Sequence, residues 1–196
     1  FGCKLDWDGS DALATNDRNC WLSALAFAYV RTGSASALIN GTTLIFPKGA
    51  SMSCGTTGGF NLVIPQGVII KGAGVYGGSM LKQCASDPST DHFLSLCDPV
   101  ANQGQFGCRI EDFAIKSDAD GNSGVSLVYS NSGQQFPLVN NIYMEVTKRV
   151  CLYYEIGRGG ASNAIFENVD CEAAGTNVND GITIASNVGS TQVVIR

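Results

Sequence analysis

Short apolar runs alternate with Gly, Pro and Asn along residues 43–83 of the chain. In Val63–Ile70, the β-branched runs Val63-Ile64 and Val68-Ile69-Ile70 flank a Pro-Gln-Gly turn. No run in this stretch keeps a helical period of 3.6 residues for three turns. The pattern therefore predicts consecutive short strands that reverse at tight corners, which is how a parallel β-solenoid begins.

A loose repeat of roughly 27 residues follows from Cys108, and repeats of this length indicate stacked supersecondary units. Each copy has an apolar residue, a polar pair ending in Asp or Asn, and then alternating apolar and outward residues. The copies are Ile110–Lys116, Val139–Glu145 and Phe166–Glu172, at offsets of 29 and 27 residues. A second strand follows each copy, at Gly124–Leu127, Arg149–Leu152 and Gly181–Ile184.

The repeat also predicts which side chains stack, because faces alternate along a strand and parallel rungs lie about 4.8 Å apart. Two interior ladders are expected, one of Phe113, Ile142 and Val169 and one of Ile115, Met144 and Cys171. Asp and Asn tolerate left-handed backbone, so the corner between strands is predicted at Asp112, Asn141 and Asn168.

A single amphipathic helix is predicted over residues 16–30, with Asn16 or Asp17 as its cap and Gly33 as its stop. Its apolar face is predicted to hold Trp21, Leu25, Ala28 and Tyr29. We interpret this helix as a cap over the first coil, whose strand edges and apolar interior need a cover. The predicted domains are a turn and capping helix at 1–37 and a β-helix at 38–196, and we expect the natural protein to continue beyond the last strand.

Composition supports a single β-rich domain, since the chain of 196 residues is 44% hydrophobic and 15% charged and has 24 glycines. The net charge of −5 and the lack of a basic cluster argue against nucleic acid and anionic membrane as partners. No apolar run approaches the roughly 20 residues that cross a bilayer.

The eight cysteines are an even number, which permits disulfides, but they contain no Cys-x-x-Cys pair that would favour zinc. A hydrophobic core of this size does not need disulfides for stability, and free cysteines are commonly buried. The interpretation favoured by these observations is a set of free, mostly buried thiols.

The outward positions of the repeat carry the candidate chemistry: Lys116, Tyr143, Glu145, Asp170 and Glu172, with Ala114 between them. Glu145 and Glu172 are expected on adjacent rungs, so their carboxyls approach the ~5–5.5 Å typical of retaining glycoside hydrolysis. Asp170 is an alternative catalytic partner, and Tyr143 and Lys116 are candidate sugar-binding residues. The alternative is an acidic surface that is merely solvated.

Other motifs predict structure more than chemistry. The acidic turns at residues 6–11 and 118–122 lack the ligand spacing of a calcium loop, and Gly72–Gly77 lacks the strand-helix context of a dinucleotide site. His92, the single histidine, is expected to be structural. Arg158 is a candidate for binding an acidic sugar, and Asn40-Gly41-Thr42 is a lone glycosylation sequon. No metal or cofactor is expected.

Several stretches together resemble a known family. They are Asp8-Gly9 with Asn16-Asp17 and the helix, Phe46-Pro47-Lys48-Gly49, and Leu62–Gly74 followed by Ser79–Lys82. This arrangement resembles the pectate-lyase-like right-handed parallel β-helix superfamily, and most closely the head of a bacteriophage tailspike or tail-fibre depolymerase. The insert before Asn16 is longer than usual, and Asn16 stands where Asp is commoner.

The resemblance implies an all-β, single-stranded right-handed parallel β-helix with an N-terminal α-helical cap. It implies a virion-tail protein, usually a homotrimer beside other tail proteins, that binds and degrades bacterial surface polysaccharide as a hydrolase or lyase. Two alternatives stay open: a non-catalytic receptor-binding or structural tail or adhesin β-helix, and a secreted pectinase-like or polygalacturonase-like enzyme.

Overall fold

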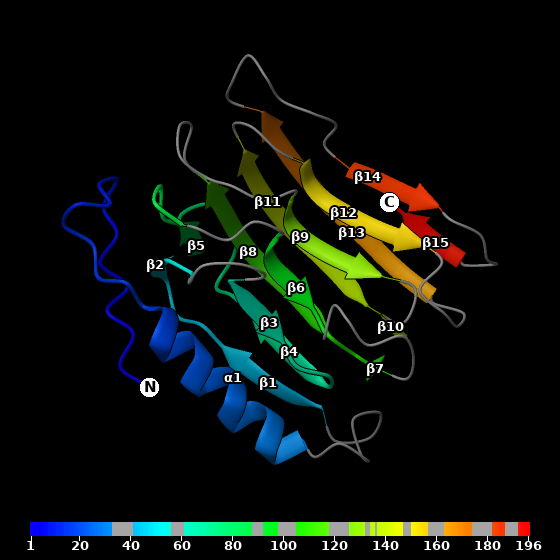
Figure 1. Ribbon diagram of the computed structural model, residues 1–196, viewed down its shortest axis with the longest axis horizontal. Coiled ribbons are helices and arrows are strands. Elements are labelled where there is room, and N and C mark those ends of the chain that lie inside the picture. Colours follow the sequence, from blue (N-terminus) through cyan, green and yellow to red (C-terminus); the bar gives the residue numbers. More distant parts are fainter. Residues whose placement is uncertain are drawn as a thin grey trace.

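The computed structural model describes residues 1–32, 41–55, 61–87, 92–97, 105–117, 126–131, 134–135, 137–146, 150–156, 163–173, 182–186 and 192–196. Within these residues the chain forms a helix and short strands (Figure 1). The elements are α1 (Arg18–Thr32), β1 (Thr42–Ile45), β2 (Gly49–Ser53), β3 (Leu62–Ile64), β4 (Val68–Lys71), β5 (Ser79–Gln83), β6 (His92–Leu96), β7 (Gln105–Phe106), β8 (Arg109–Ser117), β9 (Ser126–Asn131), β10 (Gln134–Gln135), β11 (Leu138–Val146), β12 (Val150–Ile156), β13 (Asn163–Ala173), β14 (Ile182–Ser186) and β15 (Gln192–Ile195).

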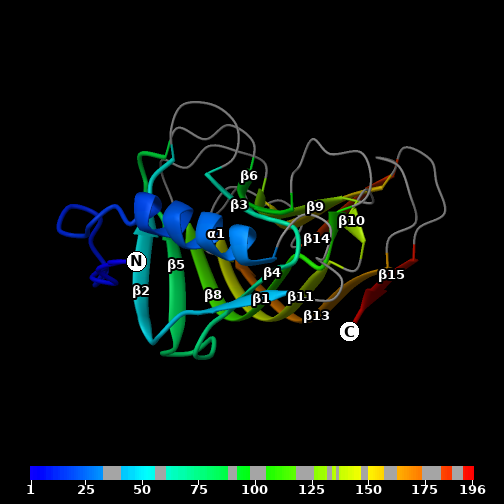
Figure 2. The same cartoon turned by 90° about the horizontal axis from the view of Figure 1, so that it is seen from below.

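Parallel pairing between successive coils builds two main sheets. One has the order β1-β4-β8-β11-β13-β15, and β2 and β5 pair beside β8 in the same sheet. The other has the order β3-β6-β9-β12-β14, and β7 and β10 form a small third sheet. Figure 2 shows the strands of successive coils side by side. The chain is therefore a parallel β-solenoid with a helix near its N-terminus, as predicted.

The predicted register is confirmed rung by rung. Ile142 pairs with both Phe113 and Val169, and Met144 pairs with both Ile115 and Cys171. The side chains of both ladders point into the core, where Phe113, Ile142, Ile115 and Met144 are at most 1% exposed. The sequence repeat therefore corresponds to the length of one coil of the solenoid.

The predicted corner is also confirmed, because Asp112, Asn141 and Asn168 adopt φ angles of 59°, 53° and 52°. Asn141 Nδ2 donates a hydrogen bond of 2.6 Å to Asp112 Oδ1, which joins two of the corner side chains between coils. Each of β8, β11 and β13 bends at this left-handed residue, which turns one run of chain into two faces of the solenoid.

The sequence placed some strands wrongly. The sequence pattern also predicts a single strand over Leu44–Gly49, but this run is broken at Pro47, which has no N–H to donate. Ser79 Oγ donates to the Pro47 carbonyl at 2.8 Å. Strand β2 was missed because Gly49-Ala50-Ser51-Met52-Ser53 has no β-branched residue. The short β7 and β10 were missed too.

The Gly72–Gly77 stretch is a coil corner with no helix after it, as the sequence predicted. A Cβ on Gly72 would lie 2.2 Å from the Asp112 carbonyl oxygen, so the next coil leaves no room for a side chain. The stretch does not have the strand-helix context of a nucleotide site.

Helix α1 covers the first coil. Its first helical hydrogen bond runs from Trp21 N to Asp17 O at 3.0 Å, which makes Asp17 the N-cap residue. Trp21 stacks on Phe46 with ring centroids 3.8 Å apart, and its Nε1 donates to Ser51 Oγ at 2.8 Å. The prediction for Tyr29 was wrong: it is 38% exposed, and the buried face is centred toward Ala24, which is 2% exposed.

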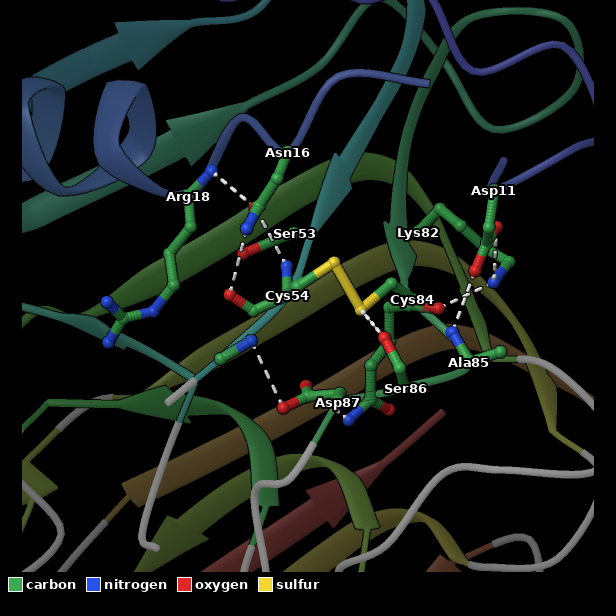
Figure 3. The surroundings of a disulfide bond; sticks show 12 residues. Asp11, Asn16, Arg18, Ser53, Cys54, Lys82, Cys84, Ala85, Ser86 and Asp87 are labelled. Carbon is green, nitrogen blue, oxygen red and sulfur yellow. Dashed lines mark hydrogen bonds and ion pairs between the residues drawn. A yellow bond between two sulfur atoms is a disulfide. The ribbon is translucent and has the colours of Figure 1, made fainter. Parts of the chain in front are cut away.

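The interpretation of the cysteines as free thiols was wrong, since all eight are paired. The disulfides are Cys3–Cys20, Cys54–Cys84, Cys97–Cys108 and Cys151–Cys171, with Cα atoms 5.2–6.1 Å apart. Cys54 and Cys84 follow the paired residues Ser53 and Gln83, so coil stacking places them one rung apart (Figure 3). The spacing of the cysteines along the sequence does not indicate which of them lie on adjacent rungs.

The predicted domain boundary at residue 37 lies outside the described residues. No described helix has the length and apolarity that a bilayer crossing requires.

The four disulfides give a first prediction. Peptide mapping of unreduced protein from an oxidising compartment is expected to recover the four pairs named above. Reduction is expected to lower the free energy of unfolding, measured by denaturant titration, by about 2–4 kcal/mol for each bridge, because the unfolded chain gains freedom. Eight alkylatable thiols in the denatured, unreduced protein would contradict the pairing.

Candidate functional site

Two rows of outward side chains run across β2, β5, β8, β11 and β13 of the large sheet. Each row takes one residue from each strand, and the two rows are two residues apart along the strands. The first row holds Ala50, Met80, Ala114, Tyr143 and Asp170, and the second holds Met52, Lys82, Lys116, Glu145 and Glu172. Glu145 and Glu172 are paired residues of β11 and β13, so their adjacency on neighbouring rungs is as the sequence predicted.

The two glutamates have different partners. Lys116 Nζ lies 2.8 Å from Glu145 Oε1, with both side chains about a quarter exposed. Glu172 is exposed and accepts a hydrogen bond from the Tyr143 hydroxyl. One carboxylate therefore lies against a cation and the other against a neutral donor.

Asp170 has a tyrosine partner that the sequence analysis missed. Tyr76 Oη, from the corner after β4, donates to Asp170 Oδ2 at 3.2 Å across 94 residues of sequence. The Tyr76 and Tyr143 rings lie 5.5 Å apart, and Tyr76 is 76% exposed. The sequence does show an aromatic residue, Tyr76, in a glycine-rich corner, which could have marked it as a candidate. Only the stacking of coils places it beside the carboxylates.

Both phenols are held in their neutral form. The hydrogen bond to Glu172, together with burial and the charge of Glu145, raises the pKa of Tyr143 far above its ordinary value of about 10. Partial desolvation and the hydrogen bond to Asp170 raise the pKa of Tyr76. The cluster therefore offers two hydroxyl donors beside the carboxyl groups of Glu145, Asp170 and Glu172.

The carboxylates of the acidic turn at residues 6–11 accept hydrogen bonds from nearby backbone N–H groups and from residues beside neighbouring strands. Asp8 Oδ1 accepts from Ser10 N at 3.3 Å, which is the predicted local turn interaction. Asp6 accepts from Thr15 N at 2.9 Å, and this hydrogen bond lowers the pKa of Asp6. Within the described part of the chain, no cluster of three or more His, Cys, Asp or Glu residues has metal-binding geometry.

Asp11 lies against the second outward row. Burial raises its pKa, but hydrogen bonds from Ala85 N and Trp7 Nε1 and the charge of Lys82 outweigh burial, so the net pKa is lowered. Lys82 Nζ is 3.4 Å from Asp11 Oδ1, and its side chain is completely buried. The buried ammonium is thus matched by a carboxylate from the N-terminal turn.

His92 lies in the other sheet, away from these carboxylates. It is 8% exposed, and its ring stacks on Tyr129 and Tyr153 at centroid distances of 4.4 and 5.6 Å. This packing agrees with the structural role that the sequence predicted.

Several candidates lie outside the described residues: Arg158, Asp118, Asp120 and Asn40. The structure therefore brings five of the predicted site residues together: Lys116, Tyr143, Glu145, Asp170 and Glu172. It adds two residues that the sequence analysis did not include, Tyr76 and Trp7.

Comparisons with protein-family models, with curated protein sequences and with solved structures find no match for this chain. The parallel β-helix fold is accordingly carried by the observed strand pairing, and the likeness to a particular family by the sequence motifs alone.

Titration of Tyr143 provides a second prediction. Its raised pKa means that the neutral phenol stabilises the fold below the ordinary tyrosine pKa, and that this contribution is lost as pH rises through the folded value. In folded protein, Tyr143→Phe is therefore expected to leave the tyrosinate absorbance below about pH 11 unchanged.

Guanidinium-unfolded protein is the control, because there the variant should lack one tyrosine's absorbance change near pH ~10. The loss of that change in the folded variant would show that Tyr143 titrates normally and would contradict the hydrogen bond to Glu172.

Proposed function

We propose that this chain binds an extended polysaccharide along the lateral face of its solenoid and hydrolyses it. The observation that carries the proposal is the pair Glu145 and Glu172 on adjacent rungs, with unlike partners and beside two tyrosines. Stacked rungs repeat every ~4.8 Å, which suits a long polymer and brings two carboxyls near the spacing of retaining glycosidases.

The surroundings suggest separate roles for the two carboxyls. Glu145 Oε1 lies 2.8 Å from Lys116 Nζ, and we assign the role of nucleophile to this ion-paired carboxyl group. No described cation pairs with Glu172, whose described partner is the Tyr143 phenol. Glu172 is therefore our candidate acid and base, with Asp170 as the alternative.

A retaining reaction then proceeds in two balanced steps. Glu145 attacks the anomeric carbon while the bond to the leaving oxygen breaks and that oxygen takes the proton of Glu172. Water next attacks the glycosyl ester and gives a proton to Glu172, which frees the sugar and restores both carboxyls. Tyr76 and Tyr143 provide aromatic surface for sugar rings and hydroxyl donors for sugar oxygens.

The first setting that we propose is a virion tail that recognises bacterial surface polysaccharide, with the protein as a homotrimer. It rests on the resemblance to tailspike depolymerases and on the parallel β-helix. A second setting is a secreted pectinase-like enzyme, which agrees with the four disulfides because these persist in oxidising surroundings. A virion surface also meets that condition.

Glutamine variants test the hydrolase. We expect Glu145→Gln and Glu172→Gln each to reduce the release of reducing ends about 10²–10⁴-fold while polysaccharide binding persists, because each removes one catalytic group and little volume. The substrates are purified neutral and acidic capsular polysaccharides, lipopolysaccharide O-chains and polygalacturonate.

Glu167→Gln is the matched control, because Glu167 also lies on β13 but faces Arg196 at 4.0 Å, away from the paired carboxylates. Wild-type rates in both test variants would refute the catalytic pair. Unsaturated uronate products would indicate a lyase, and saturable binding without product would indicate a receptor-binding spike.

Sizing in solution separates the two settings. The virion-tail setting predicts a stable trimer by light scattering at micromolar concentration. A stable monomer that cleaves polygalacturonate would overturn that setting in favour of the secreted enzyme.

A further inference from the structure

We propose that residues 6–16, here called the N-terminal segment, close one end of the lateral site and that Trp7 is its end wall. The site would then accept the terminal sugars of a polysaccharide and would act from a chain end. This inference rests on the proposed function and specifies how the substrate enters.

Exposure along the second outward row shows where the face is covered. Met52 is 4% exposed and the Lys82 side chain is fully buried, although the register points both outward. The side chains of Lys116 and Glu145 are 27% and 23% exposed, and Glu172 is exposed. The second outward row is therefore closed over β2 and β5 and opens toward β13.

The first outward row is covered at β8, whereas Ala50 and Met80 on β2 and β5 are half-buried and line an open pocket. Ala114 is 1% exposed, Tyr143 on the next rung is half-buried, and Asp170 on the rung beyond is exposed. A polymer lying across the rungs of β13 and β11 thus meets covered surface as it reaches β8.

The N-terminal segment provides this cover. Its two ends make parallel bridges to β2, Asp6 with Ala50 and Asn16 with Met52. Between these bridges the chain leaves the strand edge and passes outside the solenoid (Figure 2). The Trp7 ring lies 5.6 Å from Lys82 Nζ and 5.9 Å from Lys116 Nζ, so it sits over two consecutive rungs.

Trp7 is also close to the proposed catalytic carboxyl groups. The Lys116 ammonium contacts both the Trp7 ring and the Glu145 carboxylate. The Trp7 side chain is only partly buried. An indole with an accessible face is well suited to pack against a sugar ring.

The segment is anchored as a fixed wall. Asp11 accepts a hydrogen bond from Ala85 N at 2.7 Å and pairs with the buried Lys82 (Figure 3). It also accepts a hydrogen bond from Trp7 Nε1 at 2.8 Å. At the other end, Cys54 N donates to Asn16 Oδ1 at 3.0 Å. The Cys3–Cys20 disulfide joins the residues on either side of the segment, and Cys54, which binds Asn16, is itself held by the disulfide to Cys84.

The test compares a polysaccharide that the protein binds in the screen above with its own partial acid hydrolysate, at equal mass. Hydrolysis multiplies chain ends, and a closed site binds only ends. The apparent association constant per mass, measured by calorimetry, is therefore expected to rise about tenfold for a tenfold reduction in mean chain length. Wild-type digestion of the intact polymer should release one short product size from the start.

Trp7→Ala is expected to bring the binding ratio toward one and to broaden the product sizes. Leu13→Ala is the matched control, because Leu13 lies in the same segment but is 79% exposed, and it should behave as wild type. Wild-type measurements test the inference even if Trp7→Ala does not fold.

A wild-type binding ratio near one, or an immediate broad range of products, would overturn the closed end and leave the proposed hydrolase intact. Failure to bind or cleave any polysaccharide of the panel would overturn the proposed function and this inference with it.

Discussion

Backbone hydrogen bonding between successive coils is the constraint on which the rest of this structure depends. Each strand pairs in parallel with the strand one coil away, so a residue's neighbours are fixed by the register rather than by proximity in sequence. The left-handed corner at Asp112, Asn141 and Asn168 lies at the same place in β8, β11 and β13, so these three strands stack in one register. Interior ladders and outward rows both follow from it.

The same register gathers charge on the lateral face. Lys116, Glu145 and Glu172 come from three coils and line up one rung apart, and Tyr76 reaches Asp170 from a still earlier coil. Like charges at this spacing repel unless they are given partners. Here a lysine and two tyrosine hydroxyls provide the partners, and this arrangement makes the face a candidate for carbohydrate chemistry.

The N-terminus has two tasks in this architecture. Helix α1 covers the apolar interior of the first coil with Trp21 stacked on Phe46, while residues 6–16 cover its outward face with Trp7 and Asp11. Capping a solenoid is a requirement of its open first edge. In this chain the cap also defines where the exposed lateral surface starts.

The sequence by itself determined the elements that depend on local pattern: the short strands, the corner residues, the interior ladders and the existence of the helix. It also identified Glu145 and Glu172 as neighbours, because the repeat period carries register. It did not determine the disulfides, the burial of Lys82, or the contacts of Tyr76 and Trp7. These join residues in different coils or in the N-terminal turn, and only the stacked tertiary structure decides which of them meet.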